Sequence, residues 1–176
     1  MSARKLDVQK LSFMSMLAAM SIILVMLVHF PIIPAAPFLE YDPADIPILI
    51  GAFLFGPWAG LMLTVVVSVI QGLTVSAAGG VIGIFMHIFA TGIVSVVAGL
   101  IYKRNRTMKG AIVALFFGAL AWIVSMVVWN IILTPIYMGV DRSLVLGMIV
   151  PAILPFNAIK AGMNCVITFL IYKPLS

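Results

Sequence analysis

Long apolar runs, separated by short polar or proline-rich stretches, dominate this chain. The runs lack the alternation of apolar and polar residues that is typical of barrel strands, so they predict helices. A helix needs about 20 apolar residues to cross a bilayer. The pattern predicts six helices, over residues 11–30, 46–56, 58–78, 81–102, 110–137 and 150–172. We therefore expect an all-α integral membrane protein with a single membrane domain over residues 1–176.

Proline and glycine set the boundaries between these helices. Five prolines between residues 31 and 47 predict an irregular loop over residues 31–45, and Gly56-Pro57 separates a short second helix from a fuller third. Asp42, which precedes Pro43, and Asp45 are alternative N-terminal caps of the second helix. The sequence thus assigns both aspartates a structural role.

Composition agrees with a membrane environment. Hydrophobic residues make up 64% of the chain and charged residues 9%, against roughly 25% charged in a soluble domain. The net charge of +5 comes from basic residues that cluster near residues 4–10 and 103–109. Both clusters lie in the cytoplasm if both termini do, as the positive-inside rule requires. The basic residues therefore indicate topology, and we expect no binding of nucleic acid.

Lys160 is the most informative polar residue, because a charge at the centre of a spanning helix costs at least ~2.5–3.5 kcal/mol. Helical periodicity places it on one face with Asn157, Asn164 and Thr168, and this face must point into the bundle. No acidic residue lies in another predicted helix. We therefore expect Lys160 to face a ligand or a water-filled pocket; the alternatives are that it snorkels outward or pairs within the protein.

Other polar residues are open to two interpretations. Asn130 in the fifth helix either joins helices, at roughly 0.6 kcal/mol, or shares a site with Asn157 and Lys160. His87 lies above a stripe of small residues and is expected to bond a neighbour in a close helix contact. Ser15 and Ala19 form a small-xxx-small pair on the first helix.

Four stretches carry a family resemblance, and they occur in register over nearly the whole chain. They read PAAPFLEYDPADIPILIGAFLFGP (34–57), GGVIGIFMHIFATG (79–92), WNIILTPIYMG (129–139) and LPFNAIKAGMN (154–164). With these motifs the chain resembles the riboflavin-specific substrate-binding (S) components of energy-coupling factor (ECF) vitamin transporters.

The resemblance implies a six-transmembrane-helix S-component bundle in the cell membrane, with both termini cytoplasmic. Riboflavin is then the transported ligand, bound beneath the outer loop, and no cofactor is needed. A neutral ligand would leave the Lys160 charge solvated by hydroxyls rather than paired. The substrate-binding residues implied are Asn130, Asn157, Lys160, Tyr41, Leu39, Phe38, Asn164, His87, Thr91 and Gly83.

The resemblance also implies partners: a transmembrane coupling subunit, which the Ser15-xxx-Ala19 spacing would contact, and two ATPase subunits. The family motif has alanine at both positions, and Ser15 departs from it. The chain itself contains no GxxxxGK[ST] nucleotide-binding loop, no HExxH motif and no Ser-His-acid set, which argues against an enzyme.

Three alternatives stay open at this stage. One keeps the family but changes the cargo to FMN, to a flavin analogue such as roseoflavin, or to another vitamin. Another is a membrane adaptor without a small ligand, in which Asn130, Asn157 and Asn164 only join helices. The third, an intramembrane enzyme that uses His87 and Lys160, lacks a supporting acid or nucleophile.

Overall fold

The computed structural model describes residues 2–173, with side chains from residue 8 onward. Its helices are α1 (Ser2–Leu27), α2 (Asp45–Phe55), α3 (Pro57–Leu73), the 3₁₀ turn η1 (Ala77–Gly79), α4 (Gly80–Arg104), α5 (Met108–Met138), α6 (Arg142–Met148), the π-helical turn η2 (Ile149–Ile153) and α7 (Leu154–Tyr172). Because α6, η2 and α7 follow one another without a break, the described residues form six main helical segments, of which α2 and α3 are short. Their order matches the order of the predicted helices.

The bounds of the first, third and last helices differ from the prediction. The first begins at Ser2, and the third ends at Leu73 instead of residue 78. The last segment begins at Arg142 instead of residue 150. Only its first two residues, Arg142 and Ser143, are polar, and the apolar run that follows them already starts at Leu144. Its π-helical turn contains Pro151. Proline has no backbone N–H to donate, so the regular hydrogen bonds of the α-helix are interrupted at this turn.

The predicted break between α2 and α3 is confirmed. Gly56 has φ of 95°, a left-handed conformation that a side chain disfavours. Pro57 follows at the first position of α3, where its missing N–H costs no helical hydrogen bond. Together the two residues turn the chain sharply between two short helices.

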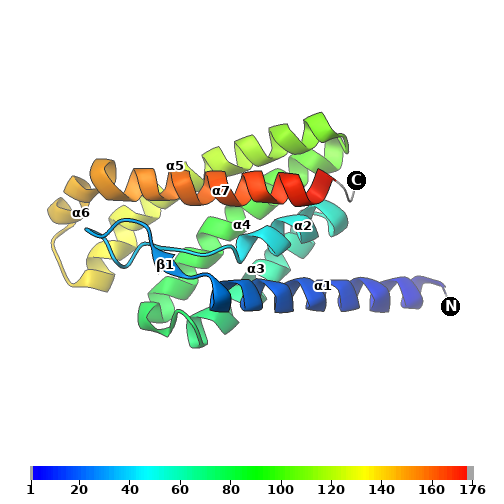
Figure 1. Ribbon diagram of the computed structural model, residues 1–176, viewed down its shortest axis with the longest axis horizontal. Helices are drawn as coiled ribbons and strands as arrows, with labels where there is room; N and C mark the ends of the chain where they lie inside the picture. Colours follow the sequence, from blue (N-terminus) through cyan, green and yellow to red (C-terminus); the bar gives the residue numbers. More distant parts are fainter. Residues whose placement is uncertain (1, 174–176) are drawn as a thin grey trace.

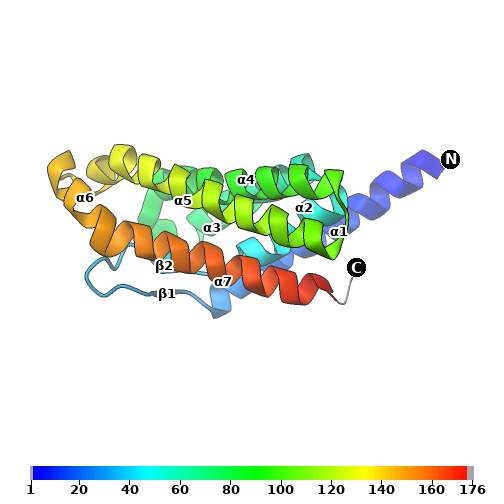
Figure 2. The same cartoon turned by 90° about the horizontal axis from the view of Figure 1, so that it is seen from above.

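The bundle is elongated, and both chain termini lie at the same end (Figure 1). The turn between α4 and α5 lies at this end too, whereas α6 and the loop that carries β1 lie at the opposite end in both views (Figures 1 and 2). We call these the terminal end and the loop end. Helix α4 packs most extensively on α5 and α3, so it occupies the centre of the bundle.

An aromatic cluster joins three helices toward the terminal end. The rings of Phe53 and Tyr102 stack with centroids 4.4 Å apart, and the hydroxyls of Tyr102 and Tyr172 lie 2.6 Å apart. These residues belong to α2, α4 and α7, and all three are buried. The bundle is therefore tightly packed away from the loop end.

The exterior is apolar enough to face lipid. Four helical segments are long and apolar enough to cross a membrane, and α2 and α3 are shorter apolar helices. Large apolar side chains stay exposed along the outer helices, such as Phe13 and Ile23 on α1, Phe116 on α5, and Val166 on α7. A surface of this kind identifies a multi-pass membrane protein.

The loop between α1 and α2 is ordered by a short hairpin. Its strands β1 (Phe30–Pro31) and β2 (Glu40–Tyr41) are antiparallel, with Phe30 opposite Tyr41. The loop side chains Ala36 and Leu39 are buried against Ile153 and Phe156 of the last helical segment. The loop is therefore packed onto the end of the bundle, where it covers the site described next.

Candidate ligand-binding site

A cavity of about 200 Å³ lies between the loop and the helices α3, α4, α5 and α7. Its apolar wall includes Leu39, Ile82, Met86, Trp122, Met126 and Phe156. Its polar groups include His29, Glu40, Asp42, Ser68, Gln71, His87, Asn130, Thr134, Asn157 and Lys160. A mostly apolar wall with a few fixed polar groups is the usual make-up of a small-molecule site.

Two buried asparagines on α5 and α7 line the cavity, and hydrogen bonds hold both amides. Asn130 Nδ2 donates to the Met126 carbonyl (2.8 Å), and its Oδ1 accepts from Thr134 Oγ1 (2.8 Å). Asn157 Nδ2 donates to the Ile153 carbonyl (2.8 Å). Since a primary amide offers two N–H groups and two lone pairs, each asparagine keeps capacity beyond these bonds.

The Asn157 amide also joins two helices across the cavity wall. Its Oδ1 accepts from Trp122 Nε1 at 3.0 Å. Trp122, Met126, Asn130 and Thr134 follow one another at intervals of four along α5, and all are buried. The indole therefore sets the amide plane of Asn157 before any ligand arrives.

Lys160 has a carboxylate partner, and the expectation that it lacks one was wrong. Its Nζ lies 2.8 Å from Asp42 Oδ2 and 3.4 Å from the Glu40 carbonyl oxygen, and the Lys160 and Asp42 side chains are only 8% and 3% exposed. Asp42 lies outside the predicted helices, in the loop that folds over the bundle. The ammonium is thus paired with a carboxylate rather than solvated by ligand hydroxyls alone.

The two aspartates do not cap α2 as expected. Ala44 occupies the cap position without a side-chain bond, and Asp42 Oδ1 accepts from the Ala44 N–H (3.1 Å) in a local turn. Asp45 is fully buried and accepts from Thr91 Oγ1 (2.5 Å) and Asn164 Nδ2 (2.7 Å). Their role is still structural, but it links the loop and α2 to α4 and α7.

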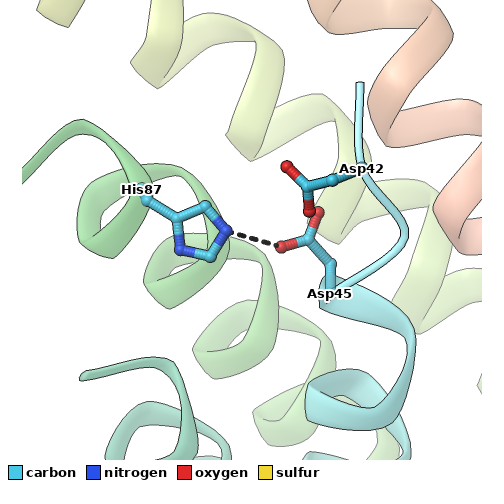
Figure 3. A group of neighbouring side chains, drawn as sticks. All are labelled: Asp42, Asp45 and His87. Atoms are coloured by element: carbon cyan, nitrogen blue, oxygen red, sulfur yellow. Dashed lines mark ion pairs between the residues drawn. The ribbon is translucent and has the colours of Figure 1, made fainter. Parts of the chain in front are cut away.

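His87 bonds a neighbouring helix, as the sequence predicts. Its Nδ1 lies 2.7 Å from Ser68 Oγ of α3, and its Nε2 lies 3.4 Å from Asp45 Oδ1. Asp42, Asp45 and His87 point toward one another in Figure 3, and their ligand atoms lie within 4.8 Å, close enough for a metal ion. Since the carboxylates already accept from Lys160 and other donors, we interpret the group as an ion-pair network.

The structure brings together seven of the ten residues in the expected binding set. The residues that line the cavity are Phe38, Leu39, Gly83, His87, Asn130, Asn157 and Lys160. The other three, Tyr41, Thr91 and Asn164, lie beside it in the network of buried carboxylates. Tyr41 donates from its hydroxyl to Asn164 Oδ1 (3.0 Å), and Asn164 Nδ2 donates to the Asp42 carbonyl (3.1 Å).

Tyr41 is a neutral donor in this network. Burial, with the nearby Asp42 carboxylate, raises the pKa of its phenol above the usual value of 10.0. The hydroxyl therefore keeps its proton at physiological pH and holds Asn164 in place. These contacts tie the loop to α7.

Comparison with known proteins identifies the family. Residues 9–172 match the family model described as the ECF transporter substrate-specific component. The chain belongs to this family. It is 30% identical to the riboflavin transporter RibU of Staphylococcus aureus, over 98% of this chain and 95% of that protein. It is also 28% identical to the riboflavin transporter FmnP of Bacillus subtilis, over 97% and 93% of the two chains.

A solved structure, described as the S component of a bacterial ECF transporter, has the same fold. It superimposes with a TM-score of 0.83 at 28% identity and covers 96% of each chain. As an S component, the protein is a membrane-embedded transporter subunit and not an enzyme. Its family implies association with an ECF module of transmembrane and ATPase subunits.

Several cavity residues of this S component escaped the sequence analysis. Gln71 and Ser68 lie one turn apart on the buried face of α3, and Gln71 Nε2 approaches Asp42 Oδ2 at 3.4 Å. Their helical spacing was a usable signal, as was the spacing of Trp122 from Asn130. Asp42 gave no such signal, because only the folded loop brings it to Lys160.

The expected coupling residues lie elsewhere on the S component. Ser15 and Ala19 are exposed on α1 and do not line the cavity. Ser15 Oγ donates to the Leu11 carbonyl of its own helix at 3.0 Å. An exposed small-residue face leaves room for close approach by another helix.

Proposed function

We propose that this S component binds riboflavin in the cavity at the loop end and delivers it to its ECF module for import. The observation that carries the proposal is the cavity itself, in which pre-oriented amides, a lysine and other polar groups lie beside an apolar wall. A flavin has matching parts, a planar ring and a hydroxylated ribityl chain. The riboflavin transporters to which the chain is similar support this choice of cargo.

Each part of the ligand has a suitable partner in the cavity. The flavin ring would pack among Leu39, Trp122, Met126 and Phe156. The remaining N–H groups and lone pairs of Asn130 and Asn157 suit hydroxyl and carbonyl groups. Lys160 supplies a further donor, because an ammonium carries three N–H groups and Asp42 does not use them all.

The proposed orientation places the loop end outside the cell and both termini in the cytoplasm. The turn between α4 and α5, with its basic residues, lies at the terminal end (Figure 1). The positive-inside rule places such a basic turn in the cytoplasm. The cavity is then near the outer face, and the loop covers it. Packing of Leu39 against Phe156 closes this cover.

Transport would need partners, since the chain carries no nucleotide-binding loop. We propose one transmembrane coupling subunit, contacted through the Ser15–Ala19 face of α1, and two ATPase subunits. The S component then contributes capture and specificity, while the ATPases supply the free energy.

Fluorescence titration of the purified protein tests the cargo. Riboflavin that enters an aromatic, water-excluded cavity beside Trp122 should lose fluorescence, and the loss should saturate at one ligand per chain. Protein purified from riboflavin-containing medium should also carry yellow flavin. A folded protein that neither co-purifies with flavin nor quenches added riboflavin would refute the proposal.

A further inference from the structure

Each basic side chain among the described residues that line the cavity has its own carboxylate neighbour. The pairs are Lys160 Nζ with Asp42 Oδ2 at 2.8 Å, His29 Nε2 with Glu40 Oε2 at 2.7 Å, and His87 Nε2 with Asp45 Oδ1 at 3.4 Å. Among the described residues, the lining includes no arginine, and Lys160 is its one lysine. With three carboxylates against one permanent cation, this region carries no surplus positive charge at any protonation state of the histidines.

This pairing bears on which flavins can enter. A phosphate monoester carries about −1.5 to −2 charges at pH 7, and its sites in proteins use arginine, lysine or helix N-termini that are free to bind it. In this cavity a phosphate near Lys160 would compete with Asp42 for the ammonium. Either the phosphate or the buried carboxylate would then lack a counter-charge, which is costly away from water.

A neutral flavin meets no such conflict. The Lys160 ammonium has three donors and makes contacts to Asp42 Oδ2 and, at 3.4 Å, to the Glu40 carbonyl. A hydroxyl or carbonyl of the ligand can therefore accept from Lys160 while the ion pair stays intact. The pair orients the donor without offering a free positive charge.

From these contacts we infer that Asp42 makes the cavity selective for uncharged flavins over phosphorylated ones. It does so by neutralising the ammonium that a phosphate would need. The inference rests on the proposed riboflavin site and specifies its substrate class. Asp42 is here a specificity-determining residue that acts through Lys160.

Binding constants for riboflavin and FMN, measured on wild type and Asp42→Asn, test the inference. Wild type should bind FMN at least tenfold more weakly than riboflavin. Asp42→Asn frees the Lys160 ammonium, so the ratio of the FMN dissociation constant to the riboflavin dissociation constant should fall tenfold or more. Asp42→Glu keeps the negative charge and should keep this ratio at the wild-type value. Asp141→Asn removes an exposed carboxylate that does not line the cavity, so it should leave both constants unchanged.

The ratio of the two constants separates specificity from a merely structural role. If Asp42 only held the loop in place, Asp42→Asn would weaken both ligands by the same factor, and the inference would be wrong. Wild type that binds FMN as tightly as riboflavin would overturn it too. Wild type that binds no riboflavin would instead remove the proposed function, and the inference with it.

A second experiment changes the ligand instead of the protein, so it still tests the inference if the Asp42→Asn variant fails to fold. A riboflavin whose terminal ribityl hydroxyl is replaced by an amine carries one positive charge at the position where FMN carries its negative phosphate. Wild type should bind this amine at least tenfold more tightly than FMN, because the carboxylates attract one and repel the other. Equal affinity for the amine and FMN would contradict the charge selection.

Discussion

At the scale of single residues, the site depends on side chains whose orientation is set before the ligand binds. Asn157 shows this best, because its oxygen accepts from Trp122 and its nitrogen donates to the Ile153 carbonyl. An amide held in this way loses little conformational entropy when it contacts a ligand. Its remaining N–H and lone pair are therefore well placed to contribute to affinity.

Replacing Asn157 by alanine should weaken riboflavin binding at least tenfold, or about 1.4 kcal/mol. The variant loses the ligand contacts and leaves the Trp122 N–H without its acceptor. Fluorescence titration measures the change. Asn105→Ala is the matched control, since Asn105 is an exposed amide in the turn between α4 and α5. Unchanged affinity in Asn157→Ala would mean that this amide only joins helices.

At the scale of elements, the Lys160–Asp42 pair fastens the loop to α7. The two residues lie 118 positions apart in the chain, and both are buried. Tyr41 and Asn164 add a second link between the same two elements. The loop should therefore unfold together with the helix end, rather than as a separate flap.

Lys160→Met should destabilise the protein by about 3–5 kcal/mol, because it leaves the Asp42 charge buried without its partner. The double variant Asp42→Asn/Lys160→Met removes both charges and should regain much of that loss. Thermal unfolding in detergent measures both. Lys10→Met, at an exposed lysine of α1, should change little. A double variant no more stable than Lys160→Met would show that charge pairing is not the cause.

Helix α1 is the element expected to meet the coupling subunit. Ser15→Leu or Ala19→Leu adds bulk to its exposed small-residue face, far from the cavity. Riboflavin binding should stay at the wild-type level, while uptake by cells that express the whole transporter should be lost. Met16→Leu, at another exposed position of α1, should preserve both. Lost binding in Ser15→Leu would link this face to the pocket instead.

At the scale of the whole molecule, hydropathy predicted the helices well because lipid exposure is a local property of each segment. The same pattern placed Lys160, Asn157 and Asn164 on one inward face, and the structure confirms that all three are buried. It missed Asp42 as the partner of Lys160, because that contact depends on how a proline-rich loop folds across the bundle. Non-local ion pairs of this kind leave no periodic trace in one sequence.

The membrane orientation of the bundle can be tested with single cysteines. Cys165 is buried, so replacing it by alanine removes the native thiol and leaves the protein surface almost unchanged. In intact cells, a membrane-impermeant maleimide should label Asp141→Cys, which lies before α6 at the loop end, and should spare Asn105→Cys beside the basic residues of the α4–α5 turn. Both native residues are exposed, so both cysteines should react once the membrane is permeabilised.

The labelling outcome decides on which side of the membrane the cavity lies. Basic residues near spanning helices stay in the cytoplasm, and the α4–α5 turn shares its end of the bundle with both termini (Figures 1 and 2). The cavity and its loop lie at the other end, so labelling of Asp141→Cys alone would place the site where external riboflavin arrives. The reverse pattern would place the cavity on the cytoplasmic side, and capture of an external vitamin by this bundle would be ruled out.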